Sequence, residues 1–159
     1  MDKKILTIES EEDFKILKNI SLPIESVENE QELIASLKEV LVEDNTSLGI
    51  AAPQIGVNKM AFAMKGRNKD ITVCINPEIV KIYPKKVGFY SESCLSIPNE
   101  KSITRRYKMI KVAYLNENGI REKKLLKDIE AIVFQHELDH LYGVLMTDKN
   151  IIKNESEEI

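Results

Sequence analysis

Two histidines and a glutamate lie close together in residues 136–140, which read His-Glu-Leu-Asp-His. Residues four apart share one face of a helix, so the rings of His136 and His140 can reach one metal ion. Glu137, beside the first histidine, can then act as a base toward a water molecule at that ion. His136 and His140 are also the only histidines of the chain. The alternative interpretation is a solvated turn of an amphipathic helix, because patterns this short recur by chance.

A metal site of this kind needs a third protein ligand, and Cys94 is the best candidate. It lies in the polar, turn-prone segment Glu92–Pro98, between two apolar runs. One cysteine and two histidines would leave the fourth coordination position open, as in catalytic rather than structural sites. An aspartate or glutamate could serve instead, and Cys94 could simply be a small buried hydrophobic residue. Cys74 fits that second interpretation well, because it lies in the continuous apolar run Ile71–Ile75.

A third segment, Ser47–Gly56, combines small residues with Gln54, whose amide could face a developing oxyanion. Alone it would indicate only a tight loop that enters a strand. Three motifs thus follow one another along the chain: Gly-Ile-Ala-Ala-Pro-Gln at 49–54, Glu-Ser-Cys-Leu-Ser at 92–96 and Gln-His-Glu-Leu-Asp-His at 135–140. In this order they resemble the three signature motifs of the peptide deformylases. The resemblance continues to about Asp148 and covers most of the chain.

The resemblance implies one metal ion with three protein ligands, Cys94, His136 and His140. It implies that Glu137 is the general acid/base. Gln54 and the backbone N–H of Leu95 would stabilise the tetrahedral oxyanion, and Gly49 would hydrogen-bond the substrate backbone. The family is usually ferrous and also works with nickel, cobalt or, more weakly, zinc. Thiolate and imidazole ligands suit any of these ions, so Fe²⁺ is expected natively by resemblance alone.

The family's reaction removes the formyl group from the N-terminal methionine of new bacterial polypeptides and releases formate. By resemblance, five residues would form a pocket for the methionine side chain: Leu48, Tyr90, Ile129, Ile132 and Val133. The three that lie on the predicted helix could equally be ordinary core. Formylmethionyl nascent peptides are thus the implied partners, and a transient contact with the ribosome stays open.

Two positions depart from the family pattern. Ser93 stands where the second motif normally has glycine, and Ser47 stands where the first motif normally begins with glycine. A serine at a position that needs a positive φ would be strained. Two other functions therefore stay open. One is a deformylase-like protein that binds formylated or N-terminal peptides with weak or no activity. The other is a different metallopeptidase or amidase with the same metal site.

Composition favours a small cytoplasmic enzyme. The 159 residues carry a formal charge of −3 and two cysteines, which predicts one domain over 1–159 and no disulfide scaffold. The N-terminus has no apolar stretch, so we expect neither a signal peptide nor a membrane contact. We also expect a monomer that does not bind DNA. A local basic cluster is interpreted as a solvated strand face: Arg105, Arg106, Lys108 and Lys111. Arg106 could instead pair with Glu92.

The predicted fold class is α+β, with antiparallel strands packed around a central helix that carries the His-Glu-x-x-His motif. Apolar spacing predicts one amphipathic helix over Glu28–Glu43 and a second from about Asp128 to Tyr142, which stops at Gly143. Short strands are expected at Met60–Met64, Ile71–Ile75, Ile79–Tyr83, Val87–Tyr90, Lys108–Leu115 and Ile120–Leu126. The last two flank a hairpin turn at 116–119. Residues 149–159 should form a short, frayed tail.

Overall fold

Antiparallel strands and three α-helices form the part of the chain that the computed structural model describes, residues 4–152. The helical elements are α1 (Glu11–Leu17), η1 (Val27–Glu30), α2 (Gln31–Glu43), η2 (Ala52–Ile55), α3 (Ile129–Leu141) and η3 (Met146–Lys149). The strands are β1 (Gly49–Ala51), β2 (Ala61–Lys65), β3 (Ile71–Ile82), β4 (Val87–Cys94), β5 (Ile97–Tyr107), β6 (Met109–Leu115) and β7 (Arg121–Lys127).

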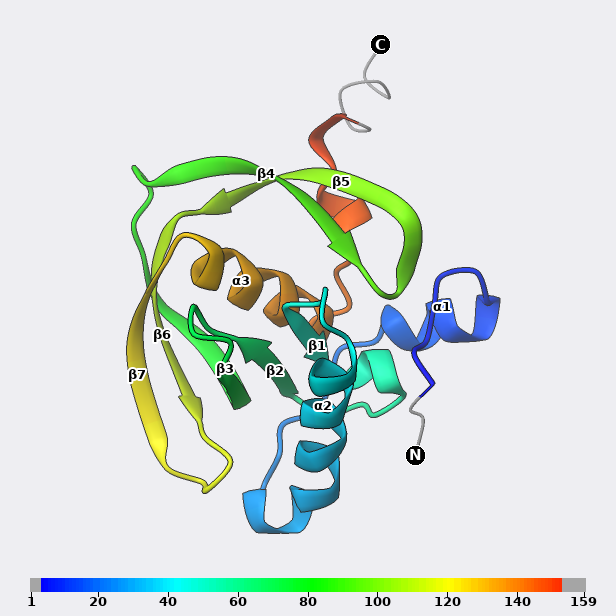
Figure 1. Ribbon diagram of the computed structural model, residues 1–159, viewed down its shortest axis with the longest axis vertical. Coiled ribbons are helices and arrows are strands. Elements are labelled where there is room, and N and C mark those ends of the chain that lie inside the picture. The colour runs from blue at the N-terminus through cyan, green and yellow to red at the C-terminus, as the bar shows by residue number, and fades with distance from the viewer. Residues whose placement is uncertain (1–3, 153–159) are drawn as a thin grey trace.

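The strands form one large sheet and one ribbon. Five strands pair in the order β1-β2-β3-β6-β7, and β4 pairs with β5 in a separate two-stranded sheet. Every strand pair is antiparallel. Helix α3 runs through the middle of the molecule, with the β4–β5 ribbon on one side and the large sheet on the other (Figure 1). The expectation of helices combined with antiparallel strands is therefore confirmed.

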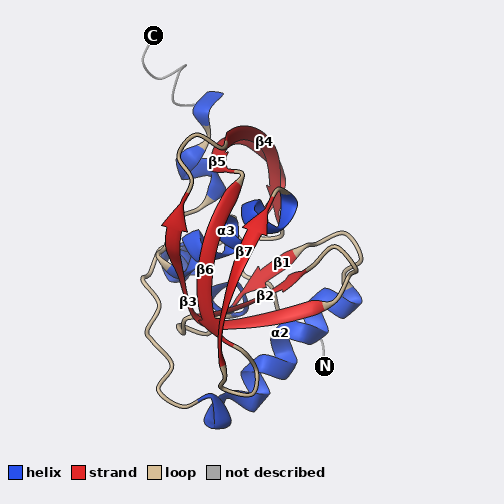
Figure 2. Ribbon diagram, turned by 90° about the vertical axis from the view of Figure 1, so that its left-hand side faces the viewer, coloured by secondary structure: helices blue, strands red, loops and turns tan. Residues whose placement is uncertain are grey.

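The two faces of the large sheet are covered by different helices. Alternate residues of a strand point to opposite faces, and Phe62 of β2 faces α3, where its ring meets that of Phe134 edge-on at 5.1 Å. The next residue, Ala63, faces α2 and packs in a cluster with Leu37. This second cluster extends over β1, β2 and the first half of β3. On the other half of that face, no helix of the described part of the chain lies over β6 and β7 (Figure 2).

Both long helices lie close to the predicted positions. In α2 the apolar residues Leu33, Ile34, Leu37, Val40 and Leu41 are buried, as the helical spacing predicts. This helix begins at Gln31 rather than Glu28, because η1 occupies the preceding turn. Helix α3 ends at Leu141, and Gly143 follows with φ +72°. A Cβ at Gly143 would lie 2.2 Å from the carbonyl oxygen of Lys18, so only glycine fits there.

The strand predictions were wrong in three places. The predicted strands Ile71–Ile75 and Ile79–Tyr83 form one strand, β3, with register shifts that accommodate Asn76 and Pro77. Strand β4 continues past Tyr90 to Cys94, so the segment predicted as turn-prone is largely strand. Strand β5 had not been predicted, because its eleven residues are mostly polar and gain their order by pairing with β4. Helix α1 had also not been predicted.

The predicted hairpin near the C-terminus is confirmed. β6 and β7 pair along their whole length, and the turn between them is held by the Asn116 side chain, which accepts hydrogen bonds from two backbone N–H groups. Of the tail predicted from residue 149, only 149–152 are described; residues 153–159 lie outside the described part. Within 4–152, no helix is both long and apolar enough to cross a membrane.

Candidate metal centre

The structure brings Cys94, His136 and His140 together from two distant parts of the chain. Their ligand atoms all lie within 4.8 Å of one another. Cys94 ends β4, while both histidines lie on one face of α3, one turn apart. The other cysteine, Cys74, is buried between strand neighbours, and burial raises the pKa of its thiol far above the usual range. Only Cys94 is therefore placed to act as a thiolate ligand.

The spacing of these atoms fits one divalent ion. Cys94 Sγ lies 3.4 Å from His140 Nε2. Two ligands of a tetrahedral ion, one sulfur at about 2.3 Å and one nitrogen at about 2.0 Å, would be about 3.5 Å apart. Burial lowers the pKa of His140 well below its usual value, which keeps its ring in the neutral form that metals bind. The described residues supply three ligands and no fourth.

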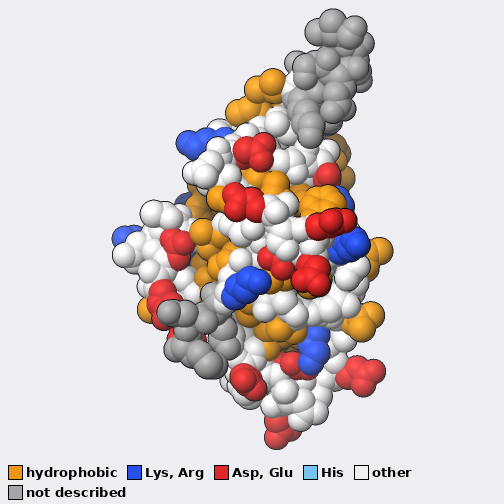
Figure 3. Space-filling model, turned by 90° about the vertical axis from the view of Figure 1, so that its right-hand side faces the viewer, with side chains coloured by type: hydrophobic (Ala, Val, Ile, Leu, Met, Phe, Trp, Pro, Cys, Tyr) orange, Lys and Arg blue, Asp and Glu red, His pale blue; other side chains and the backbone are white. Residues whose placement is uncertain are grey.

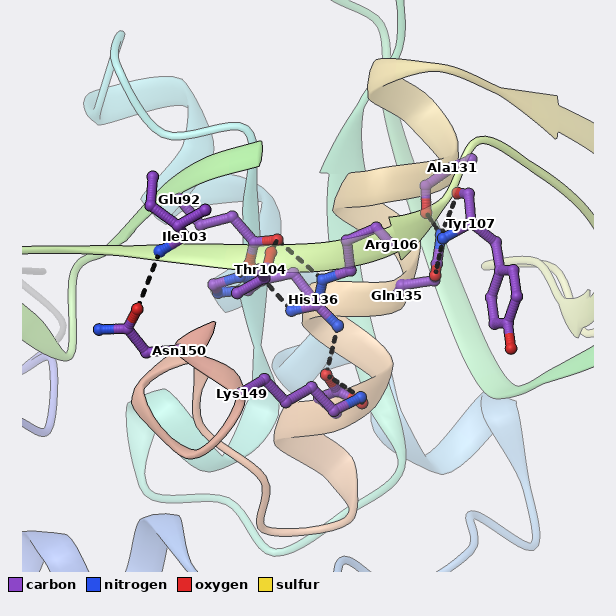
Figure 4. Close-up of polar contacts among 11 residues, drawn as sticks. Glu92, Ile103, Thr104, Arg106, Tyr107, Ala131, Gln135, His136, Lys149 and Asn150 are labelled. Carbon is purple, nitrogen blue, oxygen red and sulfur yellow. Dashed lines mark hydrogen bonds and ion pairs between the residues drawn. The ribbon is translucent and has the colours of Figure 1, made fainter. Parts of the chain in front are cut away.

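A buried chain of charges holds His136 in place (Figure 4). Its Nδ1 lies 2.8 Å from Glu92 Oε1, so Nε2 is left for the ion. Arg106 donates to both oxygens of Glu92, at 2.7 and 2.9 Å, and to Asp139 Oδ2 at 2.5 Å. Thr104 adds a short hydrogen bond to Glu92. The network ties β4, β5 and α3 to one another directly beneath the candidate ligands.

The Arg106–Glu92 pair confirms that these two residues are partners. It corrects the interpretation of Arg106 as part of an exposed basic cluster. The Arg106 side chain is only 2% exposed, so it does not belong to a solvated basic face with Arg105, Lys108 and Lys111. Burial opposes the ionisation of Glu92, but hydrogen bonds from Arg106 and His136 outweigh it and lower the pKa of Glu92 to about 2. Glu92 is therefore a carboxylate at any physiological pH.

Glu137 lies in a different environment from Glu92, although both are buried. Burial raises the pKa of Glu137 to about 7, so the group can both accept and return a proton near neutral pH. Its Oε2 atom has no hydrogen-bond partner among the described residues. A Cβ on Gly49 would lie 2.7 Å from Glu137 Oε1. Gly49 is thus the residue that leaves room for this carboxylate beside β1.

Gln54 points its amide at the sulfur ligand. Its Oε1 accepts from the Ala51 N–H at 2.9 Å, which fixes the orientation of the amide. Its Nε2 then donates toward Cys94 Sγ at 3.4 Å and Ser96 Oγ at 3.1 Å. Ser96 was missed by the sequence analysis, although it belongs to the second motif. Leu95 lies between Cys94 and Ser96 in the turn that joins β4 to β5.

A pocket of about 420 Å³ opens above these groups. Its walls include every predicted site residue except His140: Leu48, Gly49, Gln54, Tyr90, Cys94, Leu95, Ile129, Ile132, Val133, His136 and Glu137. His140 lies below the floor and is 1% exposed. The sequence analysis had not predicted the rim residues that β5 contributes, among them Asn99 and Glu100. They were missed because β5 itself was missed.

Neither serine that departs from the family pattern is strained. Ser47 and Ser93 both have negative φ, which any residue can adopt. Ser93 is exposed, and the register of β4 against β5 shifts between Glu92 and Cys94. Ser47 is held by its backbone N–H, which donates to Asp44 Oδ1 at 3.1 Å. The loops that carry the two motifs therefore accept serine without distortion.

Comparison with known proteins decides the family. The model of the polypeptide deformylase family matches residues 3–157. The chain belongs to the polypeptide deformylase family. The peptide deformylase of Caulobacter vibrioides is 33% identical over 150 residues, which are 92% of this chain and 86% of that protein. Peptide deformylase 2 of Clostridium perfringens is 34% identical over 148 residues, 92% of each chain.

Solved structures agree with this assignment. The crystal structure of the Thermotoga maritima peptide deformylase superposes with a TM-score of 0.84 at 33% identity, covering 94% of this chain and 97% of that one. The resemblance carried by the three motifs is thereby confirmed. As a deformylase, the chain is a metal-dependent hydrolase, and its reaction removes the N-formyl group from nascent polypeptides.

The negative φ of Ser93 leads to a prediction for the deformylase activity. Ser93→Gly relieves no strain, so kcat/KM on a formyl-methionyl tripeptide should stay within about twofold of the wild type in the same metal form. Added freedom of the unfolded chain should lower the free energy of unfolding by up to about 1 kcal/mol, measured by urea denaturation. A hundredfold gain in kcat/KM, about 2.7 kcal/mol, would show that the serine distorts the site.

Proposed function

We propose that Cys94, His136 and His140 hold the catalytic ion of this deformylase and that Glu137 is its general acid/base. One observation carries the proposal: three ligand atoms of the right chemical types converge at the floor of a pocket that Glu137 and Gln54 also line. The same proposal includes the fold. The chain forms a single deformylase domain, and α3, the helix that carries the His-Glu-x-x-His motif, lies in the middle of it. The family match over residues 3–157 supports it.

The donor set suits a catalytic ion better than a structural one. One thiolate and two imidazoles would leave one coordination position of a bound ion open. A bound divalent ion would supply Lewis-acid polarisation and make a water molecule easier to ionise. We propose Fe²⁺ as the native ion on the basis of the family alone, because the ligands also suit Zn²⁺, Ni²⁺ and Co²⁺.

Glu137 has the properties of a proton carrier. Its raised pKa lets it take the proton of the attacking water, and burial keeps bulk water from competing for that proton. In the protonated form it can deliver the proton to the amine as the formamide bond breaks. The water oxygen is then bonded to the former formyl carbon, and one water proton has reached the amine through Glu137. The formic acid that forms passes its acidic proton to the amine or to solvent, and formate and a free amino terminus leave.

Two further groups would stabilise the oxyanion, and one strand edge would position the peptide. The Gln54 amide, fixed by Ala51, is directed toward the site, and the backbone N–H of Leu95 follows the cysteine ligand. Loss of one such donor typically costs about 2.7–4 kcal/mol of barrier. Gly49 lies in β1, which is an edge strand of the large sheet, so an extended substrate can pair with its backbone.

The apolar part of the pocket would take the methionine side chain. Its wall comprises Leu48 from the β1 side, Tyr90 from β4 and three residues on the first two turns of α3, Ile129, Ile132 and Val133. Val133 also packs in the core between α3 and the sheet, so one side chain serves both purposes. The family match weighs against an unrelated peptidase, and the unstrained serines weigh against an inactive binding protein.

The ligand assignment predicts a difference between the two cysteines. Cys94→Ala should lose stoichiometric metal after anaerobic loading and desalting, because two imidazoles alone bind weakly. Cys74→Ala should keep the wild-type metal content, since this thiol is buried away from the site. Metal analysis of the purified proteins decides the matter. Equal metal in wild type and Cys94→Ala would contradict the assignment.

The acid/base assignment predicts a change in turnover without a change in metal content. Glu137→Gln keeps the shape of the side chain but cannot accept a proton. Formate release from a formyl-methionyl peptide should fall by about 10²–10⁴-fold while the ion stays bound. Glu130→Gln, on the first turn of the same helix, is the matched control and should retain activity. Near-normal turnover of Glu137→Gln would place the base elsewhere.

A further inference from the structure

The bare half of the large sheet carries lysines on its outward face. On β6 the inward residues Ile110, Val112 and Tyr114 are buried against α3, so alternation turns Lys111 outward. Register then places Lys81 of β3 directly opposite Lys111, and Lys123 of β7 opposite Ala113. Lys127 lies on the same side at the end of β7. We call these four residues, Lys81, Lys111, Lys123 and Lys127, the basic face; all are exposed.

Among the described residues, no helix covers the basic face. Over β1, β2 and the first half of β3 the same side of the sheet is apolar and packs under α2. Past the middle of β3 the apolar cluster ends, and β6 and β7 lie open in Figure 2. An exposed leucine, Leu125, lies in the middle of the face, opposite Lys111. One half of this side of the sheet therefore packs in the core, and the other half is open to solvent or to a partner.

The four ammonium groups are not neutralised within the protein. Among residues 4–152, no ion pair joins any of them to a carboxylate. Lys81 lies over the ring of Tyr83, 4.9 Å from its centre. Glu78, an outward carboxylate opposite Ala113, already pairs with Arg121 at 3.1 Å. Two lysines directly opposite each other on neighbouring strands destabilise a sheet, so an anionic partner would relieve this repulsion.

Charge is segregated along the whole chain, and the basic face belongs to its positive part. Residues 81–127 contain twelve Lys and Arg and four Asp and Glu, a net charge of +8. The remaining 112 residues contain eleven basic and twenty-two acidic residues, a net charge of −11. On the side of the molecule shown in Figure 3, acidic side chains are frequent and basic ones sparse. The total of −3 therefore conceals a positive segment and a negative remainder of the chain.

We propose that the basic face binds the phosphate backbone of double-stranded RNA. The site is independent of the metal centre: it lies on the side of the sheet away from α3, so RNA and a peptide substrate can be bound together. The recognition is electrostatic and independent of sequence, because lysine is a point charge that neutralises phosphate without reading a base.

The composition of the face favours a duplex over other anionic partners. Proteins that bind single strands stack bases on aromatic side chains. The aromatic ring beside the basic face, that of Tyr83, is already covered by Lys81. An anionic membrane surface would call for a larger apolar area than one leucine. Lysines on three adjacent strands of an open sheet present several point charges to a rigid backbone, whose shape rather than sequence is recognised.

The test compares two variants of equal charge on the intact protein. Lys81, Lys111 and Lys123 are changed together to Glu in the face variant. Lys4, Lys15 and Lys69, three exposed lysines outside the face, are changed together to Glu in the control. Fluorescence anisotropy measures binding to a labelled RNA stem-loop, to an unpaired RNA of the same composition and to phosphatidylglycerol vesicles. Formate release from a formyl-methionyl tripeptide is measured in parallel.

We expect the wild type and the control to bind the stem-loop with an affinity that falls with salt by a log–log slope of about −0.9 per phosphate contacted. The face variant should bind at least about tenfold more weakly at low salt, with a slope shallower by about 2–3. Both variants should keep wild-type formate release. Equal binding by the two variants, absence of stem-loop binding, or preference for unpaired RNA or for vesicles would each overturn the proposal.

Discussion

The site depends on one buried cation, the guanidinium of Arg106. It lies between two carboxylates, Glu92 and Asp139. Removing its charge would leave Glu92 buried without its bidentate partner, whereas Asp139 would keep its ion pair with Lys149. Because Glu92 is fixed from one side by Arg106, its other side can hold Nδ1 of His136 in a single orientation. Asp139 lies on the same helix as His136, so Arg106 ties the ribbon to α3 from within. The cysteine at the end of β4 thereby meets the histidines of α3 at the spacing of one ion.

Two buried glutamates beside the candidate metal ligands differ in protonation because their neighbours differ. Glu92 has a full set of donors, which lower its pKa to about 2 despite burial. Glu137 has a free oxygen atom and the bare backbone of Gly49 beside it, and burial raises its pKa to about 7. One carboxylate is therefore a permanent anion that orients a ligand, and the other is able to carry a proton. The same type of side chain thus has two functions, because the surroundings of the two glutamates differ.

Much of the site was predictable from the sequence, because motif spacing on a helix is a local property. His136, Glu137 and His140 needed only the helical repeat, and the three ordered motifs led to Cys94 and Gln54. What could not be predicted depends on long-range pairing. Strand β5 is mostly polar and is defined by its register with β4, so the rim of the pocket and Thr104, a donor to Glu92, had not been predicted. For the same reason the sequence could not decide between an exposed Arg106 and one paired with Glu92, and the sheet places this side chain in the interior. The basic face also arises from register, since its lysines come from three strands.

We infer that the charge of Glu92, acting through His136, sets the strength of the proposed metal site. The affinity for Zn²⁺, measured by competition with a chelator, tests this inference in the wild type and in Glu92→Gln. This variant keeps the shape of the side chain and a hydrogen-bonding oxygen but removes the charge. Glu100→Gln is the control, because Glu100 lines the rim of the same pocket and is exposed. We expect Glu92→Gln to bind Zn²⁺ about 10–100-fold more weakly than the wild type, and Glu100→Gln to keep the wild-type affinity. Equal Zn²⁺ affinity in all three proteins would contradict it.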